Sequence, residues 1–201
     1  MKSIRFGLLL QNIKKAAEKK ESGAITWVMG MFFMLVLSVL MVFCLQIKVW
    51  ESSSHMAQDA LAMSNLAAAI IDIERYGTDH SVLITDLDGA HDTFLHALRI
   101  NLGLDDTYRA QNSSLIGGKV IPEVFVVYNV DGAVVEVCTY QDGNWRKEAC
   151  MLDAVYAPNG QKIEETSIYS EISYPVKGAW GTGIVAHKNQ LVKVYANPEG
   201  V

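Results

Sequence analysis

The longest uninterrupted apolar run in the chain covers residues 24–47, near the N-terminus. It contains no charged residue and no proline, and its only clearly polar side chains are those of Thr26, Ser38 and Gln46. At about 1.5 Å per residue, such a helix crosses the roughly 30 Å hydrocarbon core of a bilayer. A secretory signal peptide has a shorter apolar stretch, of about 7–15 residues, followed by small residues. We therefore interpret this run as a retained transmembrane helix.

The hydrophobic pattern changes after the apolar run. Small and medium-sized side chains recur every three or four residues, at Ala57, Ala60, Leu61, Ser64, Ala67, Ala68 and Ile71. This spacing places them on one face of an amphipathic helix. Neither glycine nor proline occurs between Gly30 and Gly77. We therefore expect one helix of about 50 residues, first apolar all round and then amphipathic, that ends at Gly77.

The rest of the chain predicts one more helix and then strands. The helix is expected to start after Asp88, which can cap it, and to end at Gly103. Later segments rich in Val, Tyr and Phe are separated by Asp-Gly pairs, which favours an antiparallel meander. The expected strands cover residues 123–129, 133–140, 145–152, 166–174 and 190–196. The fold class is α+β, with the long N-terminal helix packed on a small antiparallel sheet in a pilin-like arrangement.

Charge divides the chain at the apolar run. The basic residues before it are Lys2, Arg5, Lys14, Lys15, Lys19 and Lys20, against two glutamates, whereas residues 50–201 hold 10 basic and 20 acidic residues. Lys and Arg next to a first span are retained in the cytoplasm. We expect residues 1–23 to be a cytoplasmic basic leader-like segment, 24–49 a transmembrane helix, and 50–201 one extracytoplasmic α+β domain. An acidic exterior domain lacks the basic surface that binds phosphates, so nucleic acid is excluded as a partner.

The cysteines leave one question open. Cys44 lies in the apolar run, whereas Cys138 and Cys150 belong to the outer domain, where a disulfide is chemically possible. If Asp142-Gly143 makes a two-residue hairpin, Cys138 faces Lys147 and Cys150 points to the opposite face. The compartment therefore favours a disulfide between Cys138 and Cys150, and the hairpin register opposes it.

Motifs for catalysis, cofactors or metals are not found. His91 and His96 are five residues apart, which does not align two metal ligands on a helix face. Gly117-Gly118-Lys119 lacks the upstream glycine and the following Ser or Thr of a phosphate-binding loop. No serine lies in a nucleophile elbow or a Ser-x-x-Lys pair. We therefore expect no enzyme, no cofactor and no metal site.

The residues around the start of the apolar run resemble those of a known protein family. Lys19-Lys20-Glu21-Ser22-Gly23 is followed by Ala24-Ile25-Thr26-Trp27-Val28. This segment resembles the start of type IV pilin-like precursors. More narrowly, it resembles TadE-like minor pseudopilins of the tight-adherence (Tad) pilus, in particular the gram-positive versions. The resemblance covers about 30 residues, and it implies the same pilin-like layout that the hydrophobic pattern predicts.

The resemblance also implies a processing step and partners. In that family a prepilin peptidase can cut after the glycine, which here places the cut between Gly23 and Ala24. The apolar helix then packs among other pilin-like subunits and pilus assembly proteins in the bilayer. The family commonly has glutamate at the fifth residue after the cut, where this chain has Val28. The carboxylate that pairs with a neighbouring subunit's amino terminus therefore has no counterpart at this position.

Two functions of different classes follow. The first is a membrane-anchored, pseudopilin-like structural or assembly component of a Tad (type IV-like) pilus or related secretion machinery. In it the helix-packing residues Ala57, Ala60, Ser64, Ala67 and Ile71 contact either partner helices or the protein's own sheet, because small residues permit close approach. The alternative is a single-pass membrane-anchored extracytoplasmic binding or sensing module. It requires a concave pocket, or an exposed aromatic patch near Trp145, Trp180 or Tyr174.

The orientation is directly testable. Protease added to intact cells that lack an outer barrier should remove the domain of residues 50–201, because the basic flank holds the N-terminus inside. Lysed cells serve as the control for protease sensitivity. Complete protection of the domain in intact cells, with digestion after lysis, would contradict this orientation.

Overall fold

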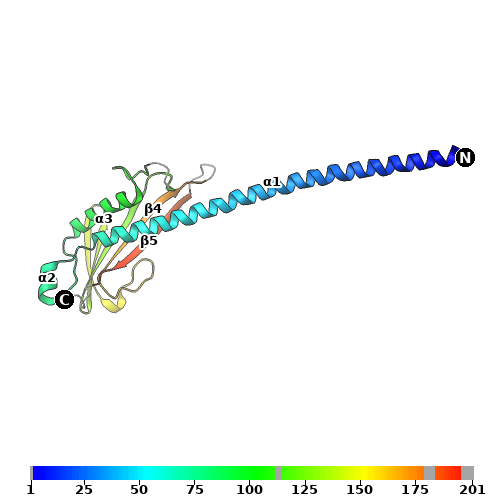
Figure 1. Cartoon of the computed structure of the whole chain (residues 1–201). Helices are drawn as coiled ribbons and strands as arrows, with labels where there is room; N and C mark the ends of the chain where they lie inside the picture. The colour runs from blue at the N-terminus through cyan, green and yellow to red at the C-terminus, as the bar shows by residue number, and fades with distance from the viewer. Residues whose placement is uncertain (1, 112–114, 179–183, 196–201) are drawn as a thin grey trace. The chain divides into compact units, whose positions relative to one another are not determined.

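The computed structural model describes residues 2–111, 115–178 and 184–195, with the backbone alone for residues 2–22 and 24 (Figure 1). The chain divides into two compact units, Met1–Lys48 and Val49–Val201. Helix α1 (Lys2–Ala68) forms the first unit and continues into the second. The second unit is an α+β domain built on a five-stranded antiparallel sheet, the fold class that the sequence predicts.

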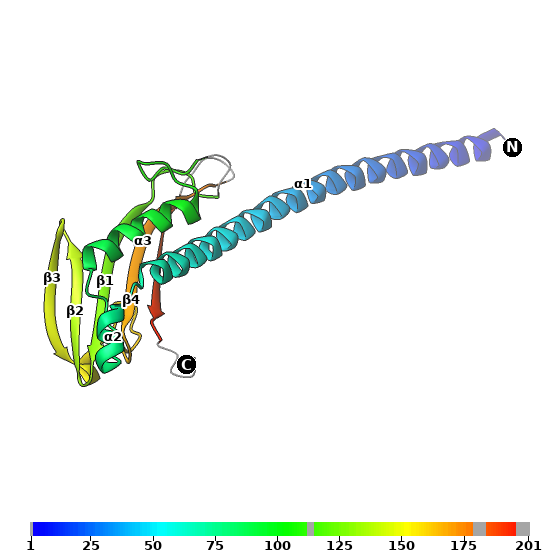
Figure 2. The ribbon, with the colours of Figure 1, turned by 60° about the vertical axis from the view of Figure 1, so that its left-hand side comes forward.

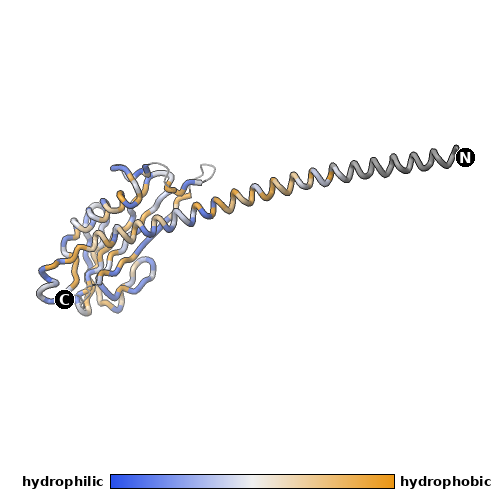
Figure 3. The backbone as a smooth tube through the Cα atoms, in the orientation of Figure 1, coloured by the Kyte–Doolittle hydropathy of each residue, from blue (hydrophilic) through white to orange (hydrophobic). Residues whose placement is uncertain are grey.

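The first unit is a helix with an apolar surface. Its side chains between Ile25 and Leu45 are almost all apolar and exposed (Figure 3). Among the described residues, α1 is the one helix that is long and apolar enough to cross a membrane. An apolar surface of this length is stable in lipid rather than in water.

The sheet is formed by five strands that follow one another closely in the sequence. Their bounds are β1 (Ile121–Asp131), β2 (Val134–Gln141), β3 (Asn144–Met151), β4 (Ser167–Val176) and β5 (Ile184–Lys193), in the spatial order β3-β2-β1-β4-β5. Asp142 and Gly143 have positive φ, as the tight β2–β3 turn requires. The predicted meander is therefore confirmed. β5 begins earlier than the 190–196 expected, and residue 196 lies outside the described residues.

One face of the sheet is covered by helices (Figure 2). The last turns of α1 and helix α3 (Leu87–Leu102) pack there, and the core between helices and sheet includes Leu61, Phe94, Leu98, Phe125, Val127, Ile168 and Ile172. α3 ends at Gly103 in the left-handed region, as expected. Its cap is Asp86, whose carboxylate accepts a hydrogen bond from the Gly89 N–H. The expectation that Asp88 caps the helix is wrong by two residues.

The small-residue face of α1 lies mainly inside this core. Ala57, Ala60 and Ser64 are buried, together with Leu61 and Ala68. Their small side chains allow the helix backbone to approach the sheet closely. Ala57 and Ala60 belong to the core of the protein's own domain.

Two residues of the predicted packing face lie elsewhere. Ala67 is exposed, and Ile71 is half-buried in the segment after the helix. α1 ends at Ala68, not at Gly77, and the short helix α2 (Ile73–Asp79) follows. Two hydrogen bonds of Asp72 accompany this redirection. Its carboxylate accepts a local hydrogen bond from the Arg75 N–H, and its N–H donates to the Leu83 carbonyl in a tertiary contact. Asp72 thus starts a new helix where the pattern predicts a continuous one.

The opposite face of the sheet is covered by the segment between β3 and β4. This segment contains the short 3-10 helix η1 (Leu152–Ala154), and a second core forms from Val126, Tyr128, Val135, Val155, Ala157, Ile163 and Tyr169. The middle of β1 and most of β4 are therefore buried on both faces. The run of residues 125–128 in β1 is apolar as such a position favours, whereas β4 places small serines among its apolar residues.

The close approach of α1 predicts a specific stability effect. Ala57 is 0% exposed, so Ala57→Leu should overpack the core and lower the free energy of unfolding by about 1–3 kcal/mol. The thermal midpoint of the full chain in detergent, followed by the circular dichroism of the sheet, should fall by about 2–10 °C. The matched control is Ala67→Leu on the exposed side of the same helix, where a change within about 0.5 kcal/mol is expected. Equal midpoints for the two variants would contradict this packing.

Candidate functional site

Large apolar side chains are exposed on the outer side of α1 and α3. Met63 and Leu66 on α1 are 58% and 59% exposed, and Ile100 on α3 is 65% exposed. The last turn of α3 lies beside α1, because the Asn101 amide donates a hydrogen bond to the Ser64 hydroxyl oxygen over 3.2 Å. We call Met63, Leu66 and Ile100 the outer apolar surface. A contiguous apolar surface of this kind can serve as a protein contact site.

A groove adjoins the outer apolar surface between the two helices. It has a volume of about 460 Å³, and its lining consists of Ser52, His55, Met56, Asp59, Ala60, Met63 and Asn101. Its lining combines small and polar side chains with two methionines, and Met63 belongs both to this lining and to the outer apolar surface. A partner that covers Met63 can therefore also place side chains into this groove.

The inner side of α1 is occupied by contacts with the sheet. The Asn65 amide donates to the Gln190 carbonyl on β5 over 2.9 Å, and Lys188 Nζ donates to the Ser54 hydroxyl over 3.0 Å. These bonds join α1 to the edge strand β5. Among the described residues of this stretch of α1, only the outer side is free of such contacts with the sheet, so a partner would meet the outer side.

The sequence analysis missed the outer apolar surface. Met63 and Leu66 are three residues apart, which is a helix-face spacing, and the signal was present in the sequence. The small residues on the other face recur more regularly, so their pattern gave the stronger signal for a packing face. Ile100 could not be grouped with them from the sequence, because the position of the last turn of α3 beside α1 depends on tertiary packing.

The predicted processing site lies within helix α1. Gly23 is exposed, and the helix continues from Lys2 through Gly23 without interruption. No neighbouring atom lies within 4 Å of the position that a Cβ would occupy at Gly23. The backbone of Ala24 is helical, and its side chain is not among those described.

Of the aromatic residues named for a binding module, the two that the structure describes, Trp145 and Tyr174, do not form an exposed patch. Tyr174 is buried, and its hydroxyl lies 3.5 Å from the Ser53 carbonyl. Trp145 packs beside α3, and its indole N–H donates to the Asp88 carboxylate over 2.7 Å. His91 stacks on Tyr140 with ring centroids 3.9 Å apart, and burial lowers the pKa of its imidazole. Trp180 lies outside the described residues.

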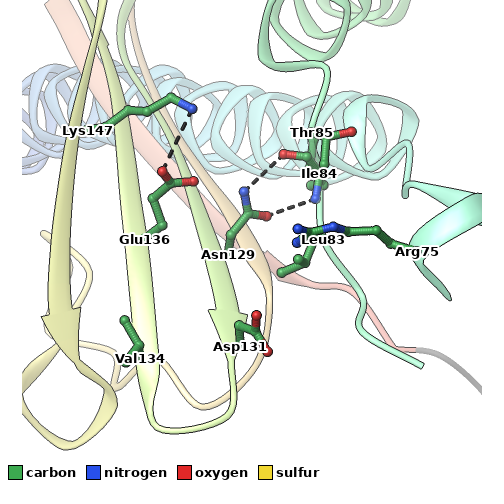
Figure 4. Close-up of a pocket in the computed structure, with 9 residues that line it drawn as sticks. All are labelled: Arg75, Leu83, Ile84, Thr85, Asn129, Asp131, Val134, Glu136 and Lys147. Atoms are coloured by element: carbon green, nitrogen blue, oxygen red, sulfur yellow. Dashed lines mark hydrogen bonds and ion pairs between the residues drawn. The ribbon is translucent and has the colours of Figure 1, made fainter. Parts of the chain in front are cut away.

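A hollow of mixed charge lies between β1, β2 and the segment after α2. Figure 4 shows its lining of Arg75, Leu83, Ile84, Thr85, Asn129, Asp131, Val134, Glu136 and Lys147, and its volume is about 420 Å³. The Asn129 side chain bonds both the N–H and the carbonyl of Ile84, at 2.8 and 2.9 Å. Lys147 pairs with Glu136 over 3.7 Å. The hollow thus presents charges of both signs around a rigid polar centre.

The cysteines of the outer domain do not form a disulfide. Cys138 faces Lys147 and Cys150 faces Val135 across the β2–β3 hairpin, as the hairpin register predicts. Cys138 belongs to the core under the helices, whereas Cys150 packs against the core on the other face. Both thiols are free because the sheet separates them. Burial raises the pKa of the Cys138 thiol to about 12, which keeps it protonated and unreactive.

Three potential metal ligands from different strands lie together. They are Glu123 on β1, Glu171 on β4 and His187 on β5, with ligand atoms all within 4.8 Å of one another. The sequence predicts no metal site. It contains no ligand spacing that would reveal this cluster, because the three residues are far apart in the sequence and only the strand order brings them together.

Comparisons with known proteins add no relative. No family model, no curated protein and no solved structure matches the chain.

Proposed function

We propose that this protein is a membrane-anchored, pseudopilin-like structural or assembly component of a Tad-type (type IV-like) pilus or related secretion machinery. Residues 24–49 anchor it in the cell membrane as a single span, the N-terminus is cytoplasmic, and the domain of residues 50–201 is extracytoplasmic. The partners are the lipid bilayer, other pilin-like subunits and pilus assembly proteins. The proposal assigns the chain no reaction of its own and no cofactor.

One observation carries this proposal. A single helix, α1, supplies both the membrane-length apolar segment and a core helix of the outer domain. A flexible linker would uncouple an anchor from its domain, whereas a helix without proline is continuous and stiff. A protein that only needs to be tethered does not require such a helix. A subunit that packs its helix beside other helices does.

The outer apolar surface supports the same proposal from the domain side. Met63, Leu66 and Ile100 are large, exposed and carried by packed helices, so they offer a rigid contact to a partner. The opposite side of α1 is already buried in the domain's own core. Because Val28 provides no carboxylate, we assign assembly to apolar packing along this outer side rather than to an ion pair in the membrane.

Prepilin peptidase is the proposed processing partner. The basic segment that ends in Lys19-Lys20-Glu21-Ser22-Gly23 precedes the apolar helix in the order that the resemblance requires. A cut after Gly23 would remove the basic flank and leave Ala24 as the new N-terminus. The helix could then leave the membrane with the fibre more easily, because the new α-amino group would be the only charge at its inner end and no charged side chain would precede Lys48.

The hollow in Figure 4 favours a second candidate function, an anchored binding or sensing module. Its volume of about 420 Å³ falls within the range of small-molecule sites. Its lining includes both signs of charge, so it would suit a small zwitterionic ligand rather than a simple anion. Such a module would act without fibre partners, which separates the two functions experimentally.

The assembly proposal predicts the effect of changing the outer apolar surface. Met63→Lys or Leu66→Lys in the full chain should reach the membrane and unfold at the unchanged temperature, since lysine keeps helix propensity and suits the C-terminal end of a helix. Burying the charge at a partner contact should weaken co-purification with pilin-like partners at least about tenfold, a loss of about 1.4 kcal/mol. Surface fibres should be lost as well.

The matched control is Met151→Lys. Met151 is 64% exposed, similar to Met63, and it lies on the edge strand β3, where lysine is well tolerated. This variant should keep partners and fibres. Normal fibres from a chain with Met63, Leu66 and Ile100 all changed to lysine would contradict the assigned surface. Absence of any pilin-like partner from the unmodified chain would contradict the proposed function and favour the binding module.

A further inference from the structure

The three clustered ligand residues lie on neighbouring strands. β1, β4 and β5 are adjacent in the sheet, Val124 of β1 faces Glu171, and Ser173 of β4 faces His187. An irregularity in the β1–β4 register falls between Pro122 and Val124, at the position of Glu123. Glu171 and Tyr169 are two residues apart on β4, so their side chains point to the same face of the sheet. This is the face away from α1 and α3. Three potential ligands therefore converge on one small area of a rigid sheet.

The distances suit a small divalent cation. The His187 Nδ1 and Glu123 Oε2 atoms are 3.2 Å apart. Two ligands bound to zinc at about 2.0–2.1 Å with tetrahedral angles are separated by about 3.3 Å. The observed distance between His187 Nδ1 and Glu123 Oε2 thus already matches the separation of two ligands in such a coordination shell. The third ligand lies within 4.8 Å of the other two, and a side-chain shift of about 1.5 Å closes the remaining distance.

Electrostatics favour a cation at the same place. With neutral imidazole, the two glutamates give the cluster a charge of about −2. Among the described residues, the only ion-pair partner of Glu123 is His187, and no ion pair includes Glu171. Like charges on adjacent strands destabilise a sheet unless something neutralises them. A divalent cation between the carboxylates would remove this repulsion.

A buried hydroxyl holds one of the ligands in position. Tyr169 is 1% exposed, and its hydroxyl donates a hydrogen bond to Glu171 Oε2 over 3.1 Å. This bond leaves Oε1 for coordination and fixes the carboxylate plane. Metal-binding carboxylates are commonly oriented by hydrogen bonds from neighbouring groups of this kind. Tyr169 is therefore a positioning residue for the cluster.

We propose that Glu123, Glu171 and His187 form a binding site for a divalent cation of the zinc class. The imidazole nitrogen selects against calcium and magnesium, which take oxygen ligands. Three protein ligands leave one position of a tetrahedral shell open to water or to a ligand from outside. Bound metal would join the edge strand β5 to β4 and β1 and so stabilise the domain. The proposal is independent of the assembly function.

The test uses the tag-free full chain in detergent after treatment with a chelator. Isothermal titration with Zn²⁺ at neutral pH should show one zinc per chain. Free Zn²⁺ at about 100 times its dissociation constant should raise the thermal midpoint by about 5 °C, and Mg²⁺ at the same concentration should not. No zinc binding up to millimolar concentration would overturn the proposal.

Variants separate this site from binding elsewhere on the chain. His187→Asn and Glu171→Gln should weaken zinc binding at least about tenfold. Neither should lower the metal-free midpoint by much, and Glu171→Gln should raise it slightly because it removes one of the two like charges. Tyr169→Phe should weaken zinc binding less, with the stoichiometry retained. The matched control is His96→Asn, an exposed histidine of α3 outside the cluster, which should bind zinc like the unmodified chain. Equal zinc affinity in the unmodified chain and the His187→Asn variant would overturn the assignment.

Discussion

The close packing of α1 on the sheet is the constraint on which the domain depends. The helix can approach β4 and β5 because its inner side carries small residues such as Ala57, Ala60 and Ser64. At that distance the Asn65 amide reaches the Gln190 carbonyl, so a side chain of the helix bonds directly to the edge strand. Larger side chains would hold the helix away and break this bond. The domain therefore cannot release α1 without losing a large part of its core.

This constraint also decides where a partner can bind. A helix with one side in its own core has only its other side for contacts, and on α1 that side presents Met63 and Leu66. α3 extends the same surface with Ile100, because Asn101 ties its last turn to Ser64. The helix that would pack in a bilayer and the helix that fixes the domain are one element.

The sequence predicts the parts of this fold that depend on local patterns. Alternating residues and Asp-Gly turns predict the meander and even the register in which Cys138 faces Lys147. The end of α1 could not be predicted, because Asp72 acts through a bond to Leu83, a tertiary contact that no helix pattern contains. The burial of Ala57 and the exposure of Ala67 depend on which side meets the sheet. The cluster around His187 depends on the strand order, which places β4 beside β1 rather than beside β3, the strand before it in the sequence.

The most direct test of the account is the N-terminus of the mature protein. The account holds that the chain enters the membrane with a basic leader, is cut after Gly23, and keeps α1 as a packing helix. Mass spectrometry of the intact chain, recovered from the membranes of its native cells and from any surface fibres, identifies the first residue. The account predicts a chain that begins at Ala24. A chain that retains Met1 in both fractions would contradict it and indicate a permanent anchor.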